Sequence, residues 1–284
     1  MRESPRSSAR KDHSLSDLGA RVLKTVGRHF VTLSCLQLAP GADAQKVFVF
    51  SGFLIEIRGV WLYVTAGHIV RDIRKSLESG VTFDRWRLDD QTAGNRFNGA
   101  AIPYDFRIER WLVIEDESVG LDYAVVVLDG FYCRALEAGG AAPLGKETWG
   151  DHVSEHDHWA LVGIPSETVQ FDQITAIAAK VVITPLEQAS EPLAAGRKAE
   201  NQFYARITDP GSVKDADGMS GGPVFALKFR EGRWWYTVIG IQSAWYRDSR
   251  VIVACPFSSL GIALEEIVNS AIKEHQRDDE RHAT

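Results

Sequence analysis

The sequence predicts an all-β protein made of antiparallel barrels or sandwiches. From residue 30 onward, short runs rich in Val, Ile, Phe, Tyr and Trp recur, and clusters of Gly, Pro, Asn or Asp separate them, as strands and their connections require. Helical segments do not alternate regularly with these runs, so a parallel sheet is a poor fit. The ten expected strands span residues 30–38, 47–57, 61–65, 123–128, 159–163, 177–183, 203–207, 224–229, 234–242 and 251–254.

Helices are expected near the two ends of the chain. Close to the N-terminus, apolar residues recur at mostly three- and four-residue intervals behind Ser14 or Ser16, either of which suits an N-cap. These residues are Leu15, Leu18, Val22, Leu23 and Val26. Residues 257–275 have the pattern of an amphipathic helix that packs one face on the last strands. The charged end, HQRDDERHAT, is expected to be solvated or disordered.

Length and composition bound the number of domains and exclude several classes of protein. The chain has 284 residues, just under two domains at roughly 150 residues each, and the string EAGGAAPLGK at residues 137–146 is the expected join. Hydrophobic residues make up 45% and charged residues 25%, as in an ordinary globular protein. The formal net charge is -6 and no Lys- or Arg-rich run occurs, so nucleic acid is not expected as a partner.

The cysteines indicate a reducing compartment, and the lack of long apolar runs argues against a secretory signal and a membrane span. Cys35, Cys133 and Cys255 are odd in number, far apart and beside apolar residues, which indicates packed thiols rather than a disulfide framework. None lies in a Gly-rich turn, so a cysteine nucleophile is not expected. The first 21 residues lack the apolar core of a secretory signal, and no window reaches the run of about 18 apolar residues that spans a bilayer. The expectation is a cytoplasmic protein with no membrane partner.

Three short strings supply the residue types that nucleophilic catalysis needs. V-T-A-G-H ends at His68, D-Y-A-V begins at Asp122, and G-M-S-G-G-P surrounds Ser220. A serine hydroxyl is a weak nucleophile unless a base takes its proton, and a carboxylate at the mouth of an apolar strand needs a partner. Gly-x-Ser-Gly also occurs in α/β-hydrolases, but that fold requires alternating helices and the order Ser, Asp, His. The three residues therefore form a candidate catalytic set in the order His, Asp, Ser.

These strings, in this order, resemble those of the chymotrypsin-like (trypsin-like) serine endopeptidases, and the free cysteines match the disulfide-free bacterial-type members. The resemblance covers roughly residues 47–264. It implies two six-stranded antiparallel β-barrels that share one cleft, an N-terminal helical extension and a C-terminal helix. The implied divisions are an extension at 1–28, a first barrel at 29–140, a second barrel at 141–256, and a helix with a charged tail at 257–284.

The resemblance also implies a role for each residue of the set. Ser220 would attack the scissile carbonyl, His68 would act as general base and then general acid, and Asp122 would hold the imidazole tautomer. The backbone N–H groups of Gly218 and Ser220 would form the oxyanion hole. No cofactor or metal is implied. The partner implied is a polypeptide substrate, and a targeting or activating protein partner is left open.

Specificity is expected to come from residues on both sides of the nucleophile. Lys214 would match the pocket floor and favour an acidic or polar P1 side chain, and Trp245 would make the pocket shallow. The other expected substrate-binding residues are Asp217, Gln242, Ser243 and Ala244, of which Ser243 would also lie near the buried aspartate. Met219 stands where secreted trypsins carry an aspartate, so activation through an ion pair with a freed amino group is excluded.

Three alternatives remain open on the residues alone. The same fold could be a catalytically silent peptide-binding module that captures an extended peptide on an exposed strand. It could be an esterase with the same triad. The loop with His152, His156 and His158 has interleaved carboxylates that could hold a divalent metal, but no second ligand group is evident and a solvated loop is the favoured interpretation.

Overall fold

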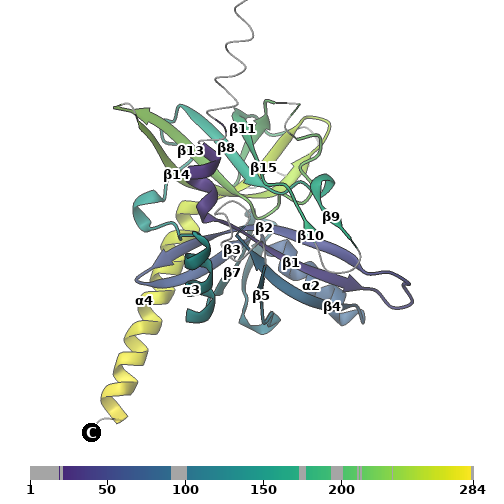
Figure 1. The fold of residues 1–284 in the computed structure, drawn as a ribbon. Coiled ribbons are helices and arrows are strands. Elements are labelled where there is room, and N and C mark those ends of the chain that lie inside the picture. The colour runs from purple at the N-terminus through teal and green to yellow at the C-terminus, as the bar shows by residue number, and fades with distance from the viewer. Residues whose placement is uncertain are drawn as a thin grey trace, which may run out of the picture.

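The structure is a computed structural model that describes residues 19, 22–90, 101–172, 177–192, 201–209, 211, 213–231 and 233–282. Two β-units lie one on the other, and the helix α4 (Phe257–His282) starts where they meet and runs down beside the N-terminal unit (Figure 1). None of the helices in these ranges is both long enough and apolar enough to cross a bilayer.

The N-terminal unit is a seven-stranded antiparallel sheet in the order β5-β4-β1-β2-β3-β7-β6. Its strands are β1 (Phe30–Leu38), β2 (Lys46–Ile57), β3 (Val60–Thr65), β4 (Thr82–Asp89), β5 (Ile102–Pro103), β6 (Leu112–Asp116) and β7 (Leu121–Val127). The prediction of a closed six-stranded first barrel is wrong for this half in the part of the chain that the structure describes, since the edge strands β5 and β6 form no ladder with each other.

Aromatic side chains from the segment between β5 and β6 pack into the interior of this sheet. The strand β5 has only two residues, and the chain then runs on to β6 through a segment that packs into the core. In that segment Phe106 stacks on Trp86 with ring centroids 4.0 Å apart, and Trp111 meets Tyr63 edge-on. The interior of the curved sheet is thereby filled, so apolar burial is achieved without a closed barrel.

The C-terminal unit is the closed six-stranded barrel that the resemblance implied. Its order is β11-β12-β15-β14-β13-β8. The strands are β8 (His158–Gly163), β11 (Val182–Ala189), β12 (Phe203–Ile207), β13 (Pro223–Arg230), β14 (Arg233–Tyr246) and β15 (Val251–Pro256). A separate two-stranded ribbon is formed by β9 (Gln170–Phe171) and β10 (Ile177–Ala178). The single strand expected over residues 177–183 is therefore two strands, because the chain leaves the ribbon before it enters the barrel.

Two helices that the sequence pattern did not predict flank the sheet. They are α2 (Gly67–Glu78) and α3 (Gly130–Gly139). Short 3-10 turns are η1 (Gly27–His29), η2 (Ile108–Arg110), η3 (Lys146–Thr148) and η4 (Ser166–Thr168). The helix α2 follows β3 with one residue between them, so the end of an apolar strand delivers the chain directly into a helix.

The two terminal helices pack across the boundary between the units. The predicted C-terminal helix is present as α4, but it continues to His282, beyond the expected end at residue 275, because Glu, Lys, Gln and Arg favour helix and no Gly or Pro interrupts them. Residues 22–26 are helical, and Val22 and Val26 are buried in the same apolar cluster as Leu227 of β13. Leu15 and Leu18 of the predicted N-terminal helix lie outside the described residues.

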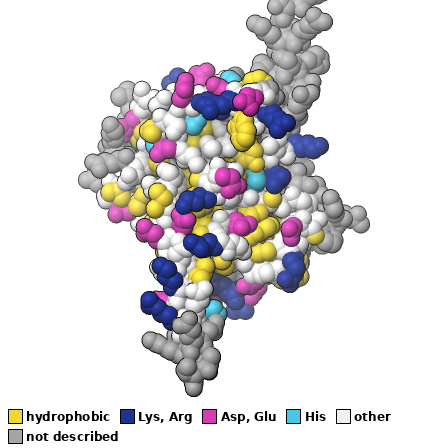
Figure 2. Space-filling model, turned by 90° about the vertical axis from the view of Figure 1, so that its left-hand side faces the viewer, with side chains coloured by type: hydrophobic (Ala, Val, Ile, Leu, Met, Phe, Trp, Pro, Cys, Tyr) yellow, Lys and Arg dark blue, Asp and Glu magenta, His cyan; other side chains and the backbone are white. Residues whose placement is uncertain are grey.

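An apolar groove of about 530 Å³ lies on the side of the molecule that carries α4, between that helix and β3, β6 and β7. Hydrophobic side chains come to the surface on this face among acidic and basic ones (Figure 2). Leu112, Val127 and Ile267 are among the large apolar side chains exposed there.

One continuous core joins the two units. Phe53 and Val64 of the sheet share a buried cluster with Phe225 and Ile241 of the barrel and with Phe257 of α4. The loop before β13 lies at this boundary and contacts both units. The contacts of that loop hold the candidate nucleophile beside the end of β3, where the candidate base lies.

Candidate active site

His68 lies in the first turn of α2, directly after β3. Thr65 Oγ1 donates a hydrogen bond of 2.8 Å to the carbonyl of Ser51 and so ties the end of β3 to β2. A Cβ at Gly67 would lie 3.0 Å from Asp122 Oδ1 and 2.6 Å from Glu115 Cγ. Glycine before the histidine thus lets the backbone approach the carboxylate closely.

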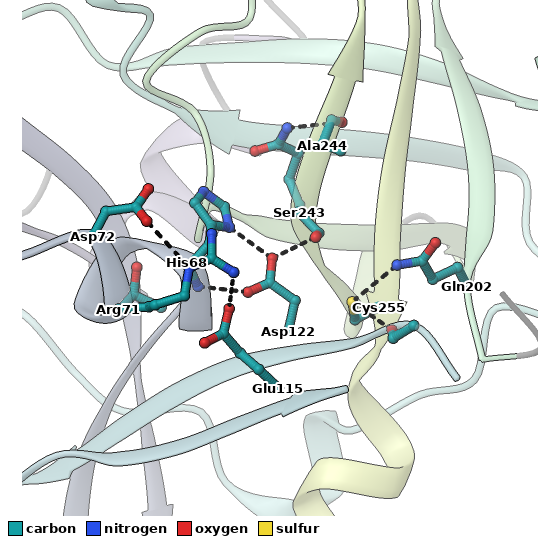
Figure 3. Close-up of polar contacts among 12 residues, drawn as sticks. His68, Arg71, Asp72, Glu115, Asp122, Gln202, Ser243, Ala244 and Cys255 are labelled. Carbon is teal, nitrogen blue, oxygen red and sulfur yellow. Dashed lines mark hydrogen bonds and ion pairs between the residues drawn. The ribbon is translucent and has the colours of Figure 1, made fainter. Parts of the chain in front are cut away.

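Asp122 of β7 receives donors from both units of the protein. His68 Nδ1 lies 2.7 Å from Oδ2, the backbone N–H of His68 donates to Oδ1 over 2.7 Å, and Ser243 Oγ of β14 donates to Oδ2 (Figure 3). Burial alone would raise the pKa of Asp122, but these hydrogen bonds and the charge on His68 hold it below its usual value. The carboxylate is therefore ionised near neutral pH.

This contact sets the protonation of the imidazole. Burial disfavours the charged form of His68, but the hydrogen bond to Asp122 and its negative charge outweigh burial, so the pKa of His68 is raised above 6.5. In the neutral ring Nδ1 carries the proton toward Asp122, which leaves Nε2 as an acceptor. The side chain of His68 is 26% exposed and lines a cleft, so that acceptor is within reach of a ligand.

The loop with Ser220 is fixed by hydrogen bonds to its backbone carbonyl groups. The carbonyl of Asp217 accepts from the backbone N–H of Ser166 over 2.7 Å. Gly218 has φ +87° and Gly221 φ +85°, a region that favours glycine. Because the C=O and N–H of a trans peptide point in opposite directions, the N–H of Gly218 is directed away from Ser166. Among the residues that the structure describes, the N–H groups of Gly218 and Ser220 have no acceptor.

Ser51 is a residue of the site that the sequence did not indicate. Its hydroxyl is fully buried, accepts from the N–H of Ile164 over 3.0 Å and donates to the carbonyl of Gly218 over 3.0 Å. One side chain of the sheet therefore holds two backbone groups of the barrel. A polar residue at a buried position of the apolar strand β2 was the available signal, but its partners are more than 100 residues away in sequence.

Ser220 is half-buried and lines the same cleft as His68 and Gly218. In this structure no hydrogen bond within the described residues joins Ser220 Oγ to the His68 ring. Hydrogen bonds of this kind are often long without a substrate and tighten when one binds. The structure thus places His68 and Ser220 on one cleft, with the His68 ring held by Asp122 and without a hydrogen bond between His68 and Ser220.

The residues expected to recognise substrate take several different positions. Gln242 is fully buried and its side chain donates to the carbonyl of Ala244 over 3.0 Å, while its backbone pairs with Gly221 and Gly222. Gln242 therefore supports the Ser220 loop, and Ser243 bonds to Asp122. Trp245 is half-buried against a buried apolar cluster.

Lys214, the expected pocket floor, and Asp217 are both exposed. The N–H of Lys214 donates to Glu167 Oε1 over 3.1 Å. Arg247 Nη2 pairs with Asp217 Oδ2 at 3.1 Å and also with Asp215. This ion-pair cluster on the barrel side of Ser220 was not predicted, because no local pattern in the sequence marks it.

The three histidines at residues 152, 156 and 158, the last of which begins β8, have separate contacts. His152 stacks on Phe203 with centroids 4.6 Å apart, His156 Nε2 bonds to the carbonyl of Asp151 at 2.8 Å, and His158 faces Trp234. No group of three or more His, Cys, Asp or Glu side chains that could hold a metal occurs in the described ranges.

The three cysteines are free, and two of them are buried. Burial raises the pKa of Cys255 to about 12 and also raises the pKa of Cys35 and of the half-buried Cys133. None of these thiols is poised as a thiolate nucleophile, in agreement with the prediction of packed residues.

Comparison with known proteins finds likeness at the level of solved structures. The chain is similar to the thermostable serine protease AL20 from an extremophilic microorganism, with 14% identity over 80% of this chain and 90% of that chain and a TM-score of 0.43. It is also similar to the protease Anisep from Arthrobacter nicotinovorans, with 16% identity over 81% and 90% and a TM-score of 0.42. No protein-family model and no curated protein matches the sequence.

Proposed function

We propose that this chain is a serine endopeptidase in which Ser220 is the nucleophile, His68 the general base and Asp122 the residue that orients the base. The observation that carries the proposal is the 2.7 Å hydrogen bond from His68 Nδ1 to Asp122, at the edge of the cleft that Ser220 also lines. It sets the tautomer in which Nε2 can accept the serine proton.

The reaction would proceed through an acyl-enzyme. Ser220 Oγ attacks the peptide carbonyl carbon as its proton passes to His68 Nε2, and the carbonyl oxygen becomes an oxyanion. The C–N bond then breaks as His68 gives the proton to the departing amine. In the second half, His68 takes a proton from water, the hydroxide attacks the ester carbonyl, and Ser220 leaves with the proton returned by His68.

The backbone of the Ser220 loop supports the oxyanion step. The N–H groups of Gly218 and Ser220 lack acceptors within the described residues. The bond from Ser166 to the Asp217 carbonyl holds the peptide that carries the N–H of Gly218. The bond from Ser51 to the Gly218 carbonyl holds the next peptide, which precedes the one that carries the N–H of Ser220. Two fixed donors aimed at developing charge stabilise a transition state without reorganisation, and loss of one costs roughly 10²- to 10³-fold in rate.

One observation favours a second candidate, a peptide-binding module without turnover. Ser220 and His68 are not hydrogen-bonded in the structure, so base and nucleophile are in the same cleft without being engaged. A module of this kind would bind an extended peptide through strand addition and would leave it uncut.

Labelling with a fluorophosphonate separates these candidates, because only an activated serine reacts. Wild-type protein should label, whereas Ser220→Ala and His68→Ala should not. Ser154→Ala, which removes an exposed loop serine, is the matched control and should label like wild type. Folding of each variant is checked by circular dichroism. A folded wild-type chain that does not label would overturn the proposal and favour the binding module.

Hydrolysis assays then define the bond that is cut. The proposal expects cleavage of internal peptide bonds in a mixture of synthetic peptides, detected by mass spectrometry. Labelling with hydrolysis of esters and of no peptide would favour an esterase that uses the same residues.

A further inference from the structure

A second carboxylate lies beside His68 and Asp122. Glu115 of β6 is directly opposite Asp122 of β7 in the antiparallel ladder. A Cβ at Gly67, the residue before His68, would lie 2.6 Å from Glu115 Cγ and 3.0 Å from Asp122 Oδ1, so the start of α2 packs against both acidic side chains. Two neighbouring carboxylates repel each other unless a cation compensates one of them.

Arg71 supplies that cation. It follows His68 by three residues on α2, so the two side chains leave neighbouring positions on the helix surface. Arg71 Nη1 donates to Glu115 Oε1 over 2.7 Å, and Nε donates to Asp72 Oδ1 over 3.1 Å (Figure 3). The bond to Glu115 joins the helix that carries His68 to β6, the edge strand beside Asp122.

The ion pair of Arg71 and Glu115 is partly shielded from water. The side chain of Arg71 is 35% exposed and that of Glu115 is 20% exposed. Burial raises the pKa of Glu115, the charge of Arg71 opposes this rise, and the charge of Asp122 adds to it. Arg71 therefore favours the ionised form of Glu115, and the pair places two opposite charges next to His68.

The charged and titratable groups around His68 and Asp122 come from four elements. They are Asp122 of β7, Glu115 of β6, Arg71 and Asp72 of α2, and Cys255 of β15, whose thiol is neutral because burial raises its pKa to about 12. Besides burial, which lowers the pKa of His68, the two aspartates raise it and Arg71 lowers it. The attraction between ionised Glu115 and charged His68 is mutual, so Glu115 favours the charged imidazole. The two members of one ion pair thus act on His68 in opposite directions.

We propose that Arg71 and Glu115 are positioning residues that act through His68: their ion pair fixes the first turn of α2 against β6, and their two charges balance at the imidazole. The inference rests on the proposed endopeptidase function, in which His68 takes the proton of Ser220. Neither side chain lines the cleft that His68 and Ser220 share. The balance leaves Asp122 to set the protonation of the base although a second carboxylate lies alongside it.

The test is the pH dependence of the rate constant for fluorophosphonate labelling, because only a neutral His68 can take the proton of Ser220. Arg71→Met leaves the charge of Glu115 unbalanced and should move the midpoint of the profile to higher pH by about 0.3 to 1 pH unit. Glu115→Gln leaves the charge of Arg71 unbalanced and should move the midpoint to lower pH by a similar amount. The double variant and Arg71→Lys preserve the balance of charge and should keep the wild-type midpoint.

Lys146→Met and Glu265→Gln are the matched controls. They break an ion pair of 2.7 Å that also joins two elements, η3 and α4, and they should leave the midpoint unchanged. The midpoint does not depend on the fraction of chain that is folded, so a loss of stability in a variant does not imitate the effect.

A purely structural ion pair would lower the labelling rate at every pH when either partner is removed and would leave the midpoint in place. That result, or displacement of the midpoint in the same direction by Arg71→Met and Glu115→Gln, would overturn the inference, while labelling of the wild type leaves the endopeptidase standing. If Arg71→Met does not fold, Glu115→Gln alone decides, since only a displacement to lower pH supports the inference. A folded wild-type chain that does not label at any pH removes both.

Discussion

His29 is a buried histidine at the joint between the two units, and its protonation should weaken the fold. It is 2% exposed, its Nδ1 lies 2.6 Å from the carbonyl of Ala142 and its Nε2 lies 2.8 Å from the hydroxyl of Tyr236 on β14. A neutral ring satisfies both contacts, with Nδ1–H donating to the carbonyl and Nε2 accepting from the hydroxyl. Burial lowers the pKa of His29 to about 4.

The size of the effect follows from this difference in pKa. An unfolded chain binds a proton at His29 near pH 6.5, whereas the folded chain resists protonation until about pH 4. Between these values the unfolded state binds more protons, so stability is fully present above pH 6.5, falls as the pH falls, and levels off below about 4. At pH 4.5 the loss relative to pH 7.5 from this one group is about 2 to 3 kcal/mol.

Urea denaturation of wild type and His29→Gln across pH 4.5 to 7.5 measures the effect. The variant loses stability at pH 7.5 because a neutral amide fills the site less well, but its free energy of unfolding should fall less steeply with acid, by about 2 to 3 kcal/mol over the range. His158→Gln, at an exposed histidine, controls for the substitution. Parallel pH profiles for wild type and His29→Gln would refute the reasoning.

Three further predictions concern the proposed site. Ser243→Ala removes a donor from the Asp122 carboxylate and should lower kcat/KM about 10-fold, with an unchanged value arguing against a positioning role. The raised pKa of His68 means that kcat/KM should increase with pH and reach half its maximum above pH 6.5, and a midpoint below that would contradict the assigned charge. Ser51→Ala should cost roughly 1 to 3 kcal/mol of stability and slow fluorophosphonate labelling by freeing the Gly218 peptide, whereas normal labelling would leave Ser51 a structural role only.

Strands could be predicted from the sequence where a run of β-branched and aromatic residues coincides with the whole strand. Strand β1 and strand β12 begin and end where the runs of β-branched and aromatic residues do. Strand β4 was missed because its two-residue alternation is broken at Arg85, which has φ +53°, and the register against β1 shifts between Ser34 and Leu36. The helix α2 was missed although Ile69, Ile73 and Leu77 recur at four-residue intervals, because the string that ends at His68 has the pattern of a strand end followed by a turn.

The same distinction between local and tertiary signals holds for the residues of the candidate site. His68, Asp122 and Ser220 stand in short strings that carry their own signal, and the structure brings the first two into contact and the third to the same cleft. Ser51 and Arg247 depend on partners that only the folded chain supplies. The open edge of the first unit likewise depends on tertiary structure, since aromatic side chains fill the interior of the sheet where a closed barrel was expected.

Each half of the proposed machinery is held by the opposite unit. The Ser220 loop belongs to the barrel, but Ser51 of the sheet holds the carbonyl of Gly218. The Asp122 carboxylate belongs to the sheet, but Ser243 of the barrel donates to it. Because neither unit alone completes the site, a shift between them would change the position of the nucleophile and the electrostatics of the base together. A disturbance of the boundary between the units should therefore lower the rate of the proposed reaction. His29 also lies at this boundary, so acid that protonates His29 should reduce activity by more than protonation of His68 alone would.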